Sequence, residues 1–133
     1  MAPTEPPTHR DHLQWVADNL HRVLGSDEPP FDVAVAYLSG FNAATGYSLL
    51  RDFHDWLVVE LGEGYEYHWS ALAQRVVLDI TSRSDSDASV GAETRAGSAL
   101  FGLVVRHLDS IGADGGRELH RAYADLRRAD GLP

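Results

Sequence analysis

Apolar residues recur every three or four positions along most of the chain, which is the spacing of one face of an α-helix. The first such stretch runs from Leu13 to Leu24, with Thr8 placed to cap a helix and Gly25 placed to end it. Comparable spacing continues to Leu126. No segment alternates apolar and polar residues as a half-buried strand does. The pattern therefore predicts an all-α fold.

Two neighbouring helices, Leu49 to Leu61 and Trp69 to Ile80, are predicted to form an antiparallel hairpin. Each has one apolar face, and the residues between them, 62–68, are too few for a further element. Gly62 is placed to stop the first of the two. The large apolar side chains of this hairpin and of a later helix are expected to be buried, namely Phe53, Trp56, Trp69, Leu72 and Leu103.

The most apolar stretch of the chain is Phe31 to Thr45, where apolar residues cover almost the whole circumference of a helix. A helix that is apolar all round belongs in the interior. Small residues such as Ser39, Gly40 and Ala43 would also let a neighbouring helix approach closely. We therefore expect this helix to lie at the centre of the fold.

The remaining pattern predicts the longest loop and two more helices. Residues 81–89 are polar and rich in turn formers, so they are expected to form that loop. A helix from Ala92 to Ser110 follows, with His107 on its inner face, and a last helix carries Leu119 and Leu126. The prediction for the chain is a single-domain, irregular antiparallel bundle of five or six helices over residues 9–130, preceded by a flexible tail, 1–8.

Composition narrows the possible functions of this bundle. The chain of 133 residues has no cysteine, which excludes disulfides, thiolate metal sites and cysteine nucleophiles. Its net charge of -9 argues against binding to nucleic acid and favours either a cationic partner or plain solubility. No run approaches the ~20 apolar residues of a membrane span, and the first residues do not form a secretory signal. We expect a cytoplasmic protein without a membrane partner.

Seven histidines raise the possibility of a metal site. Helical-bundle enzymes can hold a divalent metal with histidines from separate helices, and His12, His54, His68 and His107 are the candidates for that alternative. A His-Glu-x-x-His motif, which would place two zinc ligands and a base on one helix, is absent. We therefore expect no metal and no cofactor, and retain the metal-dependent enzyme as the alternative.

Other catalytic arrangements have little support in the sequence. There is no Gly-x-Ser-x-Gly motif, so nucleophilic serine chemistry lacks its usual turn. Asp52 and Asp55 are three residues apart on one helix and could exchange protons if they were buried together. Such a pair is more often a solvated helix face. The sequence favours a protein without enzymatic activity.

The residues between the two hairpin helices suggest a binding surface. Carboxylates and aromatic rings alternate there, and aromatic side chains are enriched where proteins meet partners. The alternative interpretation is that one tyrosine covers the core and the others only flank it. The expected partner is a basic protein, while a homodimer through the same surface fits almost as well. The candidate partner-binding residues are Asp55, Glu63, Tyr65, Glu66 and Tyr67.

Four short motifs carry a resemblance to a known group of proteins. They are Ala36-Tyr37-Leu38-Ser39-Gly40-Phe41, Phe53-His54-Asp55-Trp56-Leu57, Trp69-Ser70-Ala71-Leu72 and Leu100-Phe101-Gly102-Leu103. Over residues 31–108 the chain resembles small all-helical bacterial proteins, some of which look like immunity proteins of polymorphic toxin systems. The resemblance implies a helical fold and no catalytic residue. It also implies that an immunity-type inhibitor is one form that the binding function could take.

Overall fold

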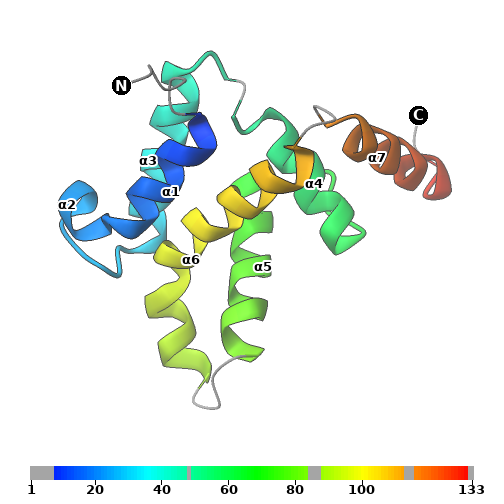
Figure 1. Cartoon of the computed structure of the whole chain (residues 1–133). Helices are drawn as coiled ribbons and strands as arrows, with labels where there is room; N and C mark the ends of the chain where they lie inside the picture. Colours follow the sequence, from blue (N-terminus) through cyan, green and yellow to red (C-terminus); the bar gives the residue numbers. More distant parts are fainter. Residues whose placement is uncertain (1–7, 48, 84–87, 113–115, 132–133) are drawn as a thin grey trace, which may run out of the picture.

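The computed structural model describes residues 8–47, 49–83, 88–112 and 116–131, and these residues form seven α-helices without a strand (Figure 1). The all-α prediction is confirmed. The helices are α1 (His9–Asp18), α2 (Leu20–Leu24), α3 (Phe31–Ala44), α4 (Arg51–Leu61), α5 (Trp69–Arg83), α6 (Ala88–Ile111) and α7 (Arg117–Ala129). None of the helices described has both the length and the apolar character needed to cross a bilayer.

The first helix begins as predicted but ends early. Thr8 and Asp11 form a reciprocal cap, in which each side chain accepts a hydrogen bond from the other residue's backbone N–H. Asn19 then breaks the helix, because its side-chain amide donates to the Trp15 carbonyl oxygen at 2.8 Å. Its backbone N–H donates to the Val16 carbonyl instead. The single helix expected up to Leu24 is therefore divided into α1 and α2, and the described residues hold seven helices rather than five or six.

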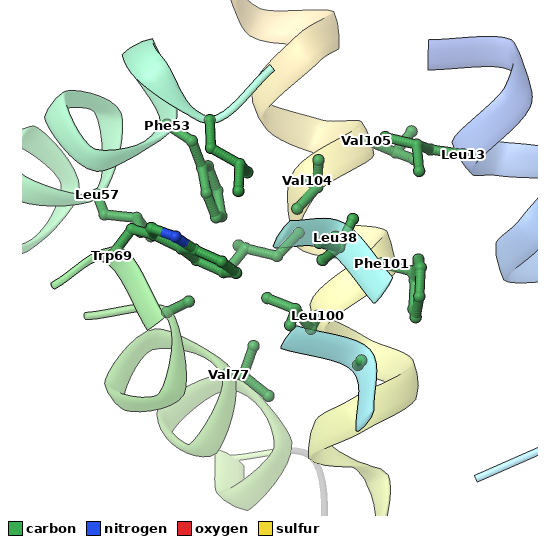
Figure 2. Packing of buried hydrophobic residues seen from close by; sticks show 14 of the residues in the cluster. Leu13, Leu38, Phe53, Leu57, Trp69, Val77, Leu100, Phe101, Val104 and Val105 are labelled. Carbon is green, nitrogen blue, oxygen red and sulfur yellow. The ribbon is translucent and has the colours of Figure 1, made fainter. Parts of the chain in front are cut away.

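The central helix is α6, which contacts α1, α3, α4, α5 and α7 (Figure 1). Neighbours on several sides cover side chains around much of its circumference, so even adjacent residues such as Leu103, Val104 and Val105 are buried. Figure 2 shows side chains from α1, α3, α4 and α5 gathered around those of α6. One cluster of buried side chains includes at least one residue from each of the seven helices.

The prediction that Phe31 to Thr45 forms the central helix is wrong. On α3 only Ala34 and Leu38 are fully buried, and Val33 is 39% exposed. Ala36 and Ala43 also face solvent. Helix α6 has 24 residues against 14 in α3, so it is long enough to contact five other helices along its length. The position of a helix thus depends on how many neighbours it can reach, and not only on how apolar it is.

The predicted helices of the hairpin, α4 and α5, pack against each other. The rings of Phe53 and Trp69 lie 5.8 Å apart and are tilted by 53°, an arrangement that suits the charge distribution of aromatic faces and edges. The side chains expected to be buried are buried, which confirms the prediction for Phe53, Trp56, Trp69, Leu72 and Leu103.

The prediction of a long loop over residues 81–89 is wrong. Helix α5 continues to Arg83 and α6 already begins at Ala88. Serine and aspartate each cost well under 1 kcal/mol in a helix, so two helices that pack along their length can continue through such residues. Residues 84–87 between the helices, and residues 1–7 of the predicted flexible tail, lie outside the described part of the chain.

Gly97 marks the closest approach between α6 and the segment before α3. A Cβ atom at this position would lie 2.0 Å from the Pro29 carbonyl oxygen, which belongs to the backbone. We expect Gly97→Ala to lower the free energy of unfolding by about 2 kcal/mol, because overpacking outweighs the gain of about 1 kcal/mol in helix propensity. Urea denaturation followed by circular dichroism measures this change.

Gly102→Ala is the matched control for that prediction. Gly102 lies on the same helix, is exposed, and has nothing within 4 Å of a Cβ atom. This substitution should raise the free energy of unfolding by about 0.5 to 1 kcal/mol, since only the helix propensity changes. Equal effects of the two substitutions would contradict the close contact at Gly97.

Candidate functional site

The segment between α4 and α5, residues 62–68, is called the link below, and two glycines set its course. Gly62 ends α4 in a left-handed conformation, with φ of 73°. Gly64 has φ of 101°, and a Cβ atom there would lie 2.5 Å from a methyl carbon of Leu72. A side chain at Gly64 would therefore be both strained and crowded. The link lies tightly against the buried start of α5.

His54 connects α4 to the backbone of the link. Its Nε2 lies 3.1 Å from the carbonyl oxygen of Tyr67, and its Nδ1 lies 3.1 Å from a carboxylate oxygen of Asp55. A carbonyl oxygen only accepts, so Nε2 is the donor in the first contact. A second hydrogen bond from Nδ1 to Asp55 requires the protonated ring. Through His54 the structure brings together two of the predicted site residues, Asp55 and Tyr67.

Glu63 and Tyr65 are held by partners from other helices. The Glu63 carboxylate accepts a hydrogen bond of 2.8 Å from Arg75 of α5. The Tyr65 hydroxyl donates to Asp130, just after α7, at 2.9 Å. Together with His54, these contacts fix the link to three different parts of the chain.

Tyr65 is more enclosed than the other aromatic residues of the link. Its ring lies 5.8 Å from that of Tyr123, and the Arg127 guanidinium stands over both rings. Two effects raise the pKa of Tyr65 to about 12, of which burial is the larger and the hydrogen bond to Asp130 the smaller. Of the predicted site residues, this tyrosine has an internal role in attaching α7.

Tyr67 and Glu66 face outward. Tyr67 is 52% exposed, although its own carbonyl oxygen is bound by His54. Glu66 is also exposed. The link thus presents the Tyr67 ring and the carboxylates of Glu63 and Glu66 on a backbone that is held in place.

Helix α7 contributes residues to this site that no sequence pattern predicts. Tyr123, Arg127 and Asp130 are about 60 residues from the link in sequence, and no local pattern connects them with it. The one available signal is that Tyr123 and Arg127 are four residues apart, so both lie on the same face of a helix. A further contact, from His120 Nε2 to Asp52 at 3.0 Å, ties the first half of α7 to α4.

The four histidines of the metal alternative lie in separate environments. His12 of α1 stacks on Phe41 at 5.1 Å, and His68 accepts a hydrogen bond from the backbone N–H of Ser70 at the start of α5. His54 contacts the link, and His107 is in the core. Across the described ranges, no three histidine, aspartate or glutamate side chains converge in a way that could hold a metal ion.

His107 is fully buried between aromatic rings of α4. Its ring lies 5.3 Å from that of Phe53 and 5.5 Å from that of Trp56. Neither ring nitrogen has a hydrogen-bond partner among the described residues. Burial lowers the pKa of His107 to about 4, and the negative charge of Asp52 opposes this shift only in part. The position expected on the inner face of the helix is confirmed.

A groove of about 470 Å³ lies elsewhere, between α3 and α5. Phe31, Asp32, Val35, Ser70, Ala71 and Gln74 line it. None of the five predicted site residues is among them. The candidate site is therefore a surface of exposed side chains rather than part of this groove.

The site as a whole consists of the link, the adjoining part of α4 and the end of α7. Its exposed groups are the Tyr67 ring and carboxylates, and its hydrogen bonds connect the link to α4, to α5 and to Asp130 after α7. The arrangement can present an aromatic side chain to a partner without first ordering the segment that carries it. Comparison with protein-family models, curated proteins and solved structures finds no match for this chain.

Proposed function

We propose that this protein is a non-enzymatic binding module that holds a basic protein partner through the link and the adjoining part of α4. The observation that carries the proposal is the geometry of Tyr67. Its side chain is 52% exposed while its carbonyl oxygen is bound to His54. Tyrosine is enriched among the residues that dominate binding energy, and a backbone already held in place reduces the entropy lost on association.

Charge supports a cationic partner over a neutral one. The chain has a net charge of -9, and Asp55, Glu63 and Glu66 place carboxylates in or beside the link. Opposite charges accelerate encounter and orient the two proteins, and salt weakens both effects. Association should therefore slow as ionic strength rises, while contact with the Tyr67 ring contributes mainly to the lifetime of the complex.

An immunity-type inhibitor in the cytoplasm is the form of this function that we favour. The resemblance of residues 31–108 to small helical bacterial proteins supports it, because some of those proteins look like immunity proteins. Such an inhibitor acts by binding and needs no catalytic group of its own. The gene for an immunity protein should lie directly beside the gene for its toxin, so the genomic neighbourhood identifies the partner to be used in the binding experiment.

We expect Tyr67→Ala to weaken binding of the partner encoded by the neighbouring gene by roughly tenfold or more. The substitution removes the exposed ring but leaves the backbone carbonyl that His54 holds. Isothermal titration calorimetry at two salt concentrations measures the affinity and its dependence on charge. Loss of affinity with unchanged circular dichroism is the expected result.

Tyr47→Ala provides a matched control outside the site. Tyr47 follows α3 and is 65% exposed, so its truncation removes a comparable surface ring. Binding by this variant should stay within about twofold of the unmodified protein, as expected for a residue away from the interface. If both variants bind equally well, the link is not the binding surface. If lysate yields no partner other than a second copy of the chain, a homodimer replaces the inhibitor as the leading account.

A further inference from the structure

Two tyrosines from different parts of the chain enclose one guanidinium group. The Arg127 guanidinium carbon lies 5.8 Å from the ring centre of Tyr65 and 5.6 Å from that of Tyr123. The two rings, called the tyrosine pair below, are 5.8 Å apart and inclined by 59°. Arg127 also donates a hydrogen bond of 3.2 Å to the Tyr123 hydroxyl. The pair thus presents two aromatic faces and a hydroxyl acceptor to the same cation.

We infer that the tyrosine pair is an arginine-binding site, filled by Arg127 in the free protein and by an arginine of the basic partner in the complex. This inference rests on the proposed function, since it specifies the side chain by which the partner is recognised. Tyr65 and the exposed Tyr67 both belong to the link and are two residues apart in the chain, so the pair includes a residue of the segment that we propose as the binding surface.

The chemistry of the pair favours arginine over lysine. A guanidinium group is planar and more weakly hydrated than an ammonium group, so it stacks on aromatic faces with a smaller loss of hydration. The Tyr65 hydroxyl donates to the Asp130 carboxylate at 2.9 Å, which places a negative charge next to the ring and increases its electron density. A lysine ammonium of equal charge lacks the flat face that two inclined rings can contact together.

Exchange of the arginine does not require α7 to detach. The first half of the helix is anchored by Leu119 in the core and by the contact of His120 with Asp52. Arg127 lies in the last turn, two turns farther along the helix. Its side chain can therefore leave the tyrosine pair while the helix stays in place.

The experiment compares Arg127→Gln with Arg128→Gln. Both substitutions remove one positive charge from the same turn. Arg127 contacts the tyrosine pair, whereas Arg128 forms an ion pair with Asp125. NMR signals of the tyrosine rings are followed while N-acetylarginine methylamide or N-acetyllysine methylamide is added. In Arg127→Gln the Tyr65 and Tyr123 signals should shift saturably with the arginine compound. The dissociation constant of the arginine compound from Arg127→Gln should be at least threefold lower than its dissociation constant from Arg128→Gln. It should also be at least threefold lower than the dissociation constant of the lysine compound from Arg127→Gln.

Equal responses of the two variants, or equal responses to arginine and lysine, would overturn the inference. Adding Tyr123→Leu to Arg127→Gln should abolish the saturable shift while the circular dichroism spectrum stays helical, and a shift that persists would also overturn it. These measurements need no partner, so their result is independent of the proposed function. The proposed function is contradicted if Tyr67→Ala binds the partner as tightly as the unmodified protein. With the partner, Arg127→Gln should bind severalfold more tightly than Arg128→Gln, and equal affinities would show that the partner does not use the pair.

Discussion

Replacing Trp69 by alanine is expected to lower the free energy of unfolding by about 3 to 5 kcal/mol. Trp69 is only 8% exposed and packs on Phe53 where α5 begins (Figure 2). Truncation removes the burial of a large ring and leaves a cavity that the surrounding helices can fill only in part. Because a domain typically has about 5 to 15 kcal/mol of net stability, this one change should take a large share of it.

Urea denaturation followed by circular dichroism at 222 nm provides the measurement, with Trp15→Ala as the matched control. Trp15 is 49% exposed on α1 and its ring lies 6.4 Å from that of His12, so its truncation should cost only about 1 to 2 kcal/mol. Similar losses in the two variants would contradict the placement of Trp69 in the core.

Stability should also fall steeply in mild acid because of His107. The folded-state pKa of this histidine is about 4, whereas an unperturbed histidine titrates near 6.5. As pH falls below 6.5, His107 becomes protonated in the unfolded chain, but in the folded chain it stays neutral until about pH 4. The contribution of neutral His107 is therefore complete above pH 6.5 and is lost between pH 6.5 and 4, by about 3 kcal/mol in total.

His107→Leu isolates this effect from the other titrating groups. Leucine fills a comparable space without a polar atom, so the variant should gain about 1 kcal/mol at pH 7 from removing an unpaired buried group. Its free energy of unfolding should then vary less between pH 7 and 4 than that of the unmodified protein. Equal pH dependence in the two proteins would show that protonation of His107 does not contribute.

The helices could be predicted because their signals are local. The cap at Thr8, the stop at Gly62 and the apolar faces around Trp69 each lie within a few residues of the element that they define. Which helix becomes central was not predictable in this way, because it depends on the area that α3 and α6 can each bury against partners far away in sequence. The break at Asn19 depends on one hydrogen bond of its side chain, which the pattern of apolar residues does not predict.

The candidate site was predictable to a similar extent. Alternating acidic and aromatic residues identified the link, and the exposure of Tyr67 is a local property of that turn. The internal role of Tyr65 depends on its contacts with Tyr123 and Asp130. These residues are distant in sequence, so the contacts depend on how α7 packs against the rest of the fold. A local pattern therefore indicates which side chains the link contains. The tertiary arrangement decides which of them are bound to other parts of the chain and which remain exposed.

The central position of α6 has a consequence for the newly made chain. During synthesis α1 and α3 leave the ribosome long before residues 88–111, on which their apolar faces pack. Until then Leu13 and Leu38 lack the neighbours shown in Figure 2 and remain available for contacts with other nascent chains. Helices α5 and α6, in contrast, follow one another directly and pack along their length, so their pairing closes a short stretch of chain and should form early. We therefore expect α1 and α3 to pack only after α6 has been made, and a pause in translation before that point should prolong the period in which aggregation competes with folding.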